Sequence, residues 1–187
     1  MNINNLQKIQ EKNDTEILEK FENFDAEIAV IGCLLWDNKS YEKIVDFITE
    51  DHFTDNNNRK IFSTIKNLLD KNILVTPITL KNHLDENDDD KYDNYTYLNQ
   101  IKDSAPSTQN AYQYAKLLYD LHIKRSLINI GNNIIQDTFN NENNLEGINL
   151  IENAENDLYN LSQTGNSDRS FINFGNALQG AVDIISE

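Results

Sequence analysis

The stretch from Ser107 to Phe139 constrains the fold most, because it runs for roughly thirty residues with no proline and a single glycine, Gly131. An unbroken run of this length predicts one α-helix about 45 Å long. The whole chain of 187 residues contains only two prolines and six glycines, too few turn-forming residues for a strand-rich fold. The sequence therefore predicts an all-α protein.

A second long helix is predicted after the polar segment NNENN at residues 140–144. Apolar residues then recur at close to 3.5-residue spacing, as in a helix that packs along another helix. Two long helices joined by a short polar turn form an antiparallel αα-hairpin. The residues predicted to pair the two helices along their seam, the line of contact between them, are Ile148, Ile151, Leu158 and Leu161.

The first helix of this hairpin carries more apolar residues than one seam can cover. A hairpin standing alone would leave part of them in water, so it needs a partner, most simply a second copy of itself. The residues predicted to contact a subunit or another partner are Tyr112, Tyr119, Ile123, Leu127, Ile130 and Ile134. The apolar pattern does not show which of these residues contact a subunit and which contact another partner.

The most hydrophobic run, FDAEIAVIGCLLWD at residues 24–37, contains the only cysteine and the only tryptophan. It is too short to span a bilayer and has no polar helical face, so it predicts a core helix that is buried on most sides. Asn23 is in position to cap it. One face of small residues and tryptophan would let another helix approach closely: Ala29, Gly32, Cys33 and Trp36.

Further short helices complete a predicted globular head. KSYEKIVDFI predicts a helix capped by Ser40 with Ile44, Val45 and Ile48 on one face, and residues 55–72 predict an amphipathic helix. Thr76 and Pro77 begin another, and YTYLNQIKD forms one more. The predicted domains are an N-terminal extension at 1–21, either disordered or a helix that orders on assembly, the head at 22–106, the hairpin at 107–163, and a linker with a last helix at 164–187.

The last predicted helix has an apolar stripe with nothing downstream to pack on: Phe174, Leu178, Ala181, Val182 and Ile185. Three explanations stay open. The chain is a fragment, the helix docks onto another subunit, or it folds back onto the hairpin.

Composition and chemistry argue against catalysis in these residues. A net charge of −15 repels phosphate backbones and anionic lipid, so no direct contact with DNA or a membrane is expected. A single cysteine and the absence of an apolar leader indicate the cytoplasm. Cys33 fits a small core residue rather than a nucleophile. We therefore expect no enzyme activity, cofactor or metal in this chain.

Three patterns resemble ligand sites without completing them. His52, His83 and His122 lie on separate elements and fit surface or capping roles better than zinc ligation. The acidic segment at residues 85–93 lacks the glycine and glutamate of a calcium loop. Gly175 and Gly180 have P-loop spacing, but Ala181 and Val182 follow where lysine and serine or threonine are needed.

The order of five segments resembles the N-terminal domain of DnaB-type replicative DNA helicases over roughly residues 22–163. The segments are NFDAEIAVIGCLLWDN, EDHFTDNNNRKIFSTIKNLLDKN, VTPITLKNHL, YLNQIKDSAPSTQNAYQYAKLLYD and IENAENDLYNLS. SFINFGNALQGAVDIISE is similar to the family's linker helix, which packs on the motor domain of a neighbouring subunit. The chain departs from the family at Asp93 and Asn94, where a glycine pair is common, and in the acidic segment before them.

The resemblance implies a collar of paired N-terminal domains in a six-subunit ring, and this collar would recruit primase. ATP and magnesium would belong to a C-terminal motor domain outside these residues, which makes the full-length protein an ATP-dependent helicase. The alternative is a stand-alone helicase-binding or loader-like adaptor of the same fold that ends at Glu187. The open reading frame beyond Glu187 distinguishes these two readings.

Overall fold

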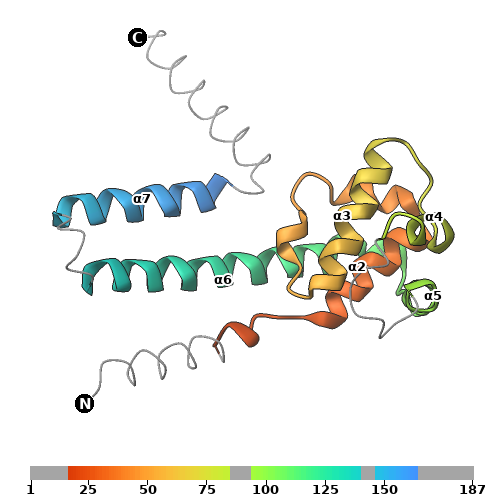
Figure 1. Cartoon of the computed structure of the whole chain (residues 1–187), viewed down its shortest axis with the longest axis horizontal. Helices are drawn as coiled ribbons and strands as arrows, with labels where there is room; N and C mark the ends of the chain where they lie inside the picture. The colour runs from red at the N-terminus through yellow and green to blue at the C-terminus, as the bar shows by residue number, and fades with distance from the viewer. Residues whose placement is uncertain (1–16, 85–93, 140–145, 164–187) are drawn as a thin grey trace, which may run out of the picture. The chain divides into compact units, whose positions relative to one another are not determined.

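The computed structural model describes residues 17–84, 94–139 and 146–163, and every regular element in these ranges is helical (Figure 1). The all-α prediction is confirmed. The elements are α2 (Phe24–Trp36), η1 (Asn38–Lys43), η2 (Glu50–His52), α3 (Asn56–Asp70), α4 (Pro77–Lys81), α5 (Asn94–Asp103), η3 (Thr108–Asn110), α6 (Ala111–Phe139) and α7 (Gly147–Gln163). None of the described helices is long and apolar enough to cross a membrane.

The chain divides into two compact units, and the division falls between Asn133 and Ile134, inside α6. The first unit therefore holds the head together with most of α6. The boundary predicted at residue 106 stays a prediction. The predicted linker helix and most of the predicted N-terminal extension lie outside the described residues.

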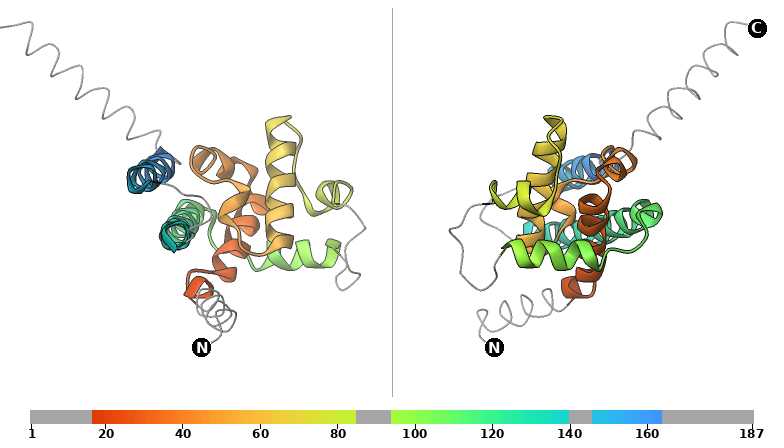
Figure 2. Two further views of the ribbon diagram at one scale, coloured as in Figure 1. Left: turned by 60° about the vertical axis from the view of Figure 1, so that its left-hand side comes forward. Right: turned by 90° about the vertical axis from the view of Figure 1, so that its right-hand side faces the viewer.

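Helix α2 is the core helix that the hydrophobic run predicts. The Asn23 side chain accepts a hydrogen bond from the Ala26 N–H at 2.9 Å, as a helix cap does. Val30, Ile31 and Leu34 are fully buried, and α2 packs against both α3 and α5 (Figure 2). Helix α2 thus forms the centre of the head.

Trp36 departs from the prediction, because 64% of its surface is exposed. It is the last residue of α2, and Asp37 after it is already extended, so the core face of the helix ends before the indole. The indole lies beside α5, where the Lys102 ammonium is 5.9 Å from the ring centroid. The small residues of this face are buried as expected, whereas its tryptophan is a surface residue.

Gly32 lies where another segment comes closest to α2. A Cβ built on Gly32 would stand 2.8 Å from the Ile101 carbonyl oxygen and 3.0 Å from the Ala105 Cβ. Neither contact can be relieved by rotating a flexible side chain, because one atom is backbone and the other is attached directly to it. The close approach predicted at Gly32 is therefore confirmed, and its partner is the C-terminal end of α5.

A buried carboxylate that no sequence pattern indicated joins three helices. Glu27 is fully buried, and its side chain accepts hydrogen bonds from the Thr54 N–H at 2.6 Å and the Thr54 hydroxyl at 2.7 Å. It also accepts from the Asp55 N–H at 3.3 Å and the Asn58 amide at 3.0 Å. Asn58 in turn accepts from the Tyr97 hydroxyl at 3.1 Å. One side chain of α2 thereby fixes the start of α3 and, through Asn58, α5.

The segment predicted as a helix behind Ser40 is instead the 3₁₀ helix η1 followed by turns, so that prediction was wrong. Asp37, not Ser40, is the cap, and its carboxylate accepts from the Lys39 N–H at 3.1 Å. Asn38 donates to the Leu34 and Val75 carbonyls and accepts from the Val75 N–H, which holds this segment against the loop after α3. As a result Val45 is exposed, although Ile44 and Ile48 are buried.

The loop between α3 and α4 begins and ends with well-known capping motifs. Asn72 has a positive φ of 57°, and its N–H donates to the Leu69 carbonyl while the Ile73 N–H donates to the Leu68 carbonyl. This pair of bonds is a Schellman motif, which ends α3. Thr76 then caps α4 with Pro77 at its first position, as predicted.

Adding a methyl group at Gly32 should destabilise the protein, because the new Cβ would overlap backbone. We expect Gly32→Ala to lower the free energy of unfolding by about 1–3 kcal/mol. Gly131 in α6 is the matched control, since a Cβ there meets no described atom within 4 Å. Gly131→Ala should raise stability by up to about 1 kcal/mol through helix propensity. Urea denaturation measures both, and an unchanged midpoint for Gly32→Ala would contradict the assignment.

Candidate interaction surface

Helix α6 runs for 29 residues and begins directly after η3, which confirms the long helix predicted from the sequence. Its N-terminal part packs on the head through small and aliphatic residues. Ala111, Ala115 and Leu118 are buried there, at spacings of three and four residues that place them on one face. The head therefore covers one face of α6 and leaves the others for other contacts.

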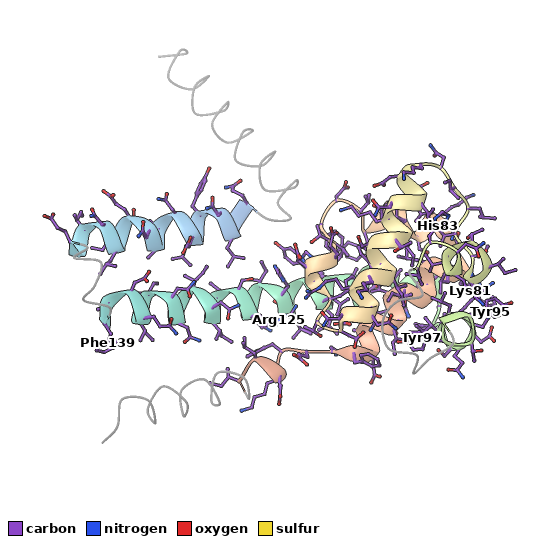
Figure 3. The ribbon with its side chains drawn as sticks, in the orientation of Figure 1. Lys81, His83, Tyr95, Tyr97, Arg125 and Phe139 are labelled. Carbon is purple, nitrogen blue, oxygen red and sulfur yellow. The ribbon has the colours of Figure 1, made fainter. Side chains whose placement is uncertain are left out.

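Arg125 fixes α6 to the head farther along the helix. Its guanidinium donates to the Phe21 carbonyl just before α2 and, at 3.0 Å, to the His52 carbonyl at the end of η2. Figure 3 labels Arg125 on α6. A planar guanidinium can serve two carbonyls at once, so this residue joins three segments that are far apart in the sequence.

Two histidines pack together near this arginine. The ring centroids of His52 and His122 are 4.5 Å apart, and His52 also stacks on Tyr119 at 5.5 Å. The Nδ1 atom of His52 accepts from the Thr49 N–H at 3.0 Å, which completes a capping box at η2. The capping role considered for these histidines is thus confirmed for His52, although its side chain is buried rather than on the surface.

Burial keeps both rings neutral. The pKa of His52 is lowered to about 4, by burial first and then by the neighbouring His122, with a smaller contribution from Arg125. The pKa of His122 is lowered as well, by burial first and by Arg125 second. With Nδ1 as acceptor, the neutral His52 ring carries its proton on Nε2, a buried atom without a hydrogen-bond partner among the described residues. Protonation would add charge and break the capping box.

The six predicted contact residues of α6 share one face, because they follow one another at steps of three, four or seven residues. Tyr112, Leu127 and Ile134 are exposed, and the other three are half-buried. This face, from Tyr112 to Ile134, is here called the α6 stripe. Which partner covers it stays a prediction.

The head adds aromatic surface to the beginning of the α6 stripe, a feature that the sequence pattern does not reveal. The Phe47 ring meets the Tyr112 ring edge-on at 5.5 Å and the Tyr119 ring at 6.0 Å. Val45, close to Phe47 in the chain, is exposed. The interpretation of KSYEKIVDFI, residues 39–48, as a helix with Ile44, Val45 and Ile48 on one face concealed this feature.

A second apolar row runs along a different face of α6 and was also missed. Its members are spaced four and seven residues apart, and Leu117 and Ile135 are the most exposed of them. The row consists of Leu117, Leu121, Ile128 and Ile135. The seven-residue repeat of Leu121, Ile128 and Ile135 is the signal that could have revealed it.

Helix α7 is present as predicted, but none of its residues is buried. Of the four residues predicted for the seam, Ile148 is 56% exposed and Ile151 55%, Leu158 is exposed and Leu161 is half-buried. Phe139 at the end of α6 and Tyr159 are exposed as well. Helix α7 thus presents apolar side chains to solvent within a single chain.

Burial raises the pKa of the Cys33 thiol, whose side chain is fully buried beside Pro106 and Ser107, so its interpretation as a core residue is confirmed. No cluster of three metal-binding side chains occurs in the described ranges. The predicted linker-helix residues Phe174, Leu178, Ala181, Val182 and Ile185 lie outside those ranges, as do the glycines with P-loop spacing.

Comparison with known proteins defines the class. The family model "DnaB-like helicase N terminal domain" matches residues 19–120. The replicative DNA helicase DnaB of Rickettsia felis is 31% identical over 154 residues, which cover 82% of this chain and 31% of the relative. That of Rickettsia bellii is 33% identical over 151 residues, covering 80% of this chain and 30% of the relative.

Solved structures show the same fold. The N-terminal domain of DnaB helicase from Mycobacterium tuberculosis superposes with a TM-score of 0.67 at 17% identity, over 74% of this chain and 97% of that one. A DnaB-like replicative helicase, studied for its interactions with primase, superposes with a TM-score of 0.60 at 21% identity, over 84% of this chain and 35% of that one.

The fold is therefore that of a helicase N-terminal domain. The chain belongs to the DnaB-like helicase N-terminal domain family. It spans about a third of the length of the curated relatives that it matches.

The histidine pair predicts a loss of stability in mild acid. The unfolded chain protonates His52 near pH 6.5, whereas the folded chain keeps it neutral down to about pH 4, so the unfolded state binds more protons between these values. Stability should fall by about 2 kcal/mol between pH 7.5 and pH 5 from this residue alone.

Urea denaturation at the two pH values measures the effect. His52→Asn keeps an acceptor for the Thr49 N–H but does not titrate, so it should flatten the pH dependence even if it lowers stability at neutral pH. His83→Asn, at an exposed histidine, should leave the pH dependence unchanged. An equally steep loss of stability in His52→Asn would contradict the assignment.

Proposed function

We propose that this chain forms the collar of a hexameric replicative DNA helicase, where it pairs subunits and recruits primase. The observation that carries the proposal is the apolar surface left exposed on α6 and α7. Residues such as Phe139, Ile148 and Ile151 have more than half of their surface in water. Soluble monomers seldom expose so many large apolar side chains on neighbouring positions, and such surfaces usually mark protein interfaces.

Subunit pairing is the simplest use of this surface. Helices with apolar residues every three or four positions associate side by side and bury each other's rows. The family membership supports this role, since its members are replicative helicases. The exposed residues of α7, Ile148, Ile151 and Leu158, would then serve contacts between subunits as well as any seam within the hairpin.

Primase recruitment would use part of the same surface. A structural neighbour was determined for its interactions with primase, which makes primase the first partner to test. The α6 stripe begins in the aromatic group of Phe47, Tyr112 and Tyr119, and aromatic side chains are the residues that most often dominate protein interfaces. We assign the aromatic beginning of the stripe to primase and its aliphatic part to subunit pairing.

The remaining activities belong to a longer protein. In this proposal a motor domain C-terminal to these residues binds ATP and magnesium, contacts DNA and unwinds it in the cytoplasm. The linker helix of each subunit docks through its apolar stripe onto the motor domain of its neighbour. The acidic chain supports this division, because a net charge of −15 disfavours contact with phosphate.

Self-association is the first testable consequence. The mass of the chain at tens of micromolar, measured by sedimentation, should exceed that of a monomer, and Ile148→Ser with Leu158→Ser should weaken association about tenfold or more. Leu74→Ser with Ile78→Ser is the matched control, because these head residues are at least as exposed and carry no assigned contact. A strict monomer at these concentrations would argue against pairing.

Primase binding is tested by calorimetric titration with the C-terminal region of the primase from the same organism. We expect heat of binding, and we expect Tyr112→Ser to weaken binding by about 1–2 kcal/mol. Leu74→Ser on the head should not change the affinity. If no heat is released at any temperature, primase recruitment is wrong.

A further inference from the structure

A continuous series of contacts joins Arg125 to the aromatic group at the beginning of the α6 stripe. The Arg125 guanidinium donates to the His52 carbonyl at 3.0 Å, and the His52 ring stacks on Tyr119 with the ring planes 22° apart. The Tyr119 ring meets the Phe47 ring edge-on, and Phe47 meets Tyr112 in the same way. The series crosses between α6 and the head at every step, so each side holds the other in place.

The contact made by Arg125 is the most directional one in this series. Ring contacts tolerate sliding and rotation, whereas a guanidinium N–H has to point at its acceptor. Arg125 donates to the Phe21 carbonyl as well as to that of His52, so its planar group is fixed from two sides. The side chain is half-buried, which strengthens both bonds by limiting competition from water. Arg125 therefore sets where the His52 backbone stands relative to α6.

The His52 ring passes this constraint on, because it cannot turn independently of its backbone. Its Nδ1 atom accepts from the Thr49 N–H at 3.0 Å, and the buried ring also packs on His122. A shift of the His52 backbone would consequently move the ring, and with it the Tyr119 ring that stacks on it. Phe47 lies two residues before Thr49 and would follow the same movement.

We propose that Arg125 is a positioning residue, which holds the aromatic group of Phe47, Tyr112 and Tyr119 in the geometry that a partner binds. This inference rests on the proposed function, which assigns that group to primase. Arg125 lies about 20 Å along the axis of α6 from Tyr112, so it acts on the far end of the group through the series of contacts. A surface that already has its bound geometry loses less conformational freedom on binding, which increases affinity.

The first test uses the 187-residue chain alone and records the ring-proton signals of Phe47 and Tyr112 by NMR. Arg125→Gln should shift these signals and weaken the nuclear Overhauser effect between the two rings, because the His52 carbonyl loses its donor. Lys124→Gln is the matched control, since it removes the same charge from the next residue, whose ion pair with Asp120 stays within α6. It should leave the signals unchanged. Unchanged ring signals in Arg125→Gln would overturn the proposal.

Arg125→Lys provides a second variant that keeps the charge. One ammonium group cannot reproduce the planar fork that serves two carbonyls, so the ring signals should shift in the same direction by a smaller amount. This variant gives the same test if Arg125→Gln fails to fold. Ring signals that respond to neither variant would show that Arg125 only attaches α6 to the head.

The second test measures binding of the C-terminal region of primase by calorimetry. Arg125→Gln should weaken binding about 3- to 10-fold, as expected when one or two side chains must be ordered on binding. Gly32→Ala is the control for stability, because it strains the contact between α2 and α5 and does not touch the aromatic group. Its affinity should equal that of the unaltered chain. An equal loss of affinity in both variants would mean that binding reports only the stability of the head, and the proposal would be wrong.

A double-mutant cycle shows whether Arg125 acts through the aromatic group. In a chain that already carries Tyr112→Ser, the Arg125→Gln substitution should cost less affinity than it does alone, because part of the surface that it positions is gone. Fully additive losses would place the effect of Arg125 elsewhere and overturn the proposal.

The two tests separate this inference from the proposed function. If primase does not bind the unaltered chain while the ring signals respond to Arg125→Gln as expected, positioning of the aromatic group stands and its assignment to primase is wrong. If primase binds with an affinity that Arg125→Gln does not change, recruitment stands and the positioning role is overturned.

Discussion

The buried carboxylate of Glu27 is the interaction on which the rest of the head depends. A buried carboxyl group is destabilising unless hydrogen bonds replace its hydration, and here four donors from Thr54, Asp55 and Asn58 do so. The arrangement of the α3 N-terminus is consequently fixed relative to α2. Arg59, one residue after Asn58, donates to the Phe53 carbonyl, and Arg125 of α6 donates to the adjacent His52 carbonyl. Glu27 thus holds the segment next to the carbonyl that receives the Arg125 hydrogen bond, one of the contacts that attach α6 to the head.

The sequence predicted the helices well where the signal was local. A cap at Asn23, a proline after Thr76 and an unbroken run up to Phe139 each report on a few neighbouring residues, and each predicted element is present. The predictions failed where contacts between residues far apart in the sequence decide the local structure. Asn38 is held by Val75, which favours a 3₁₀ helix over the α-helix that residues 39–48 would form by pattern alone. Glu27 looked like one more acid in an acidic chain, because its donors are about thirty residues away.

In the candidate interaction surface, too, the sequence indicates features that depend on neighbouring residues and hides those that depend on distant contacts. Helical spacing identified the α6 stripe, since residues on one face recur every three or four positions. It could not reveal that Phe47 joins this stripe, because that contact forms between a turn and a helix more than sixty residues apart in sequence. Nor could spacing decide which apolar row serves the hairpin and which serves another molecule, since both rows of α6 satisfy the same periodicity.

Charge supplies a distinction that periodicity cannot. Apolar rows attract any other apolar row, so a domain that exposes several of them risks indiscriminate association. A net charge of −15 opposes such association, and on α7 the acids Glu152, Glu155 and Asp157 stand among exposed apolar residues with no lysine or arginine on the same helix. Carboxylates that look like mere solubility residues in the sequence thus limit the indiscriminate association that exposed apolar rows would otherwise allow.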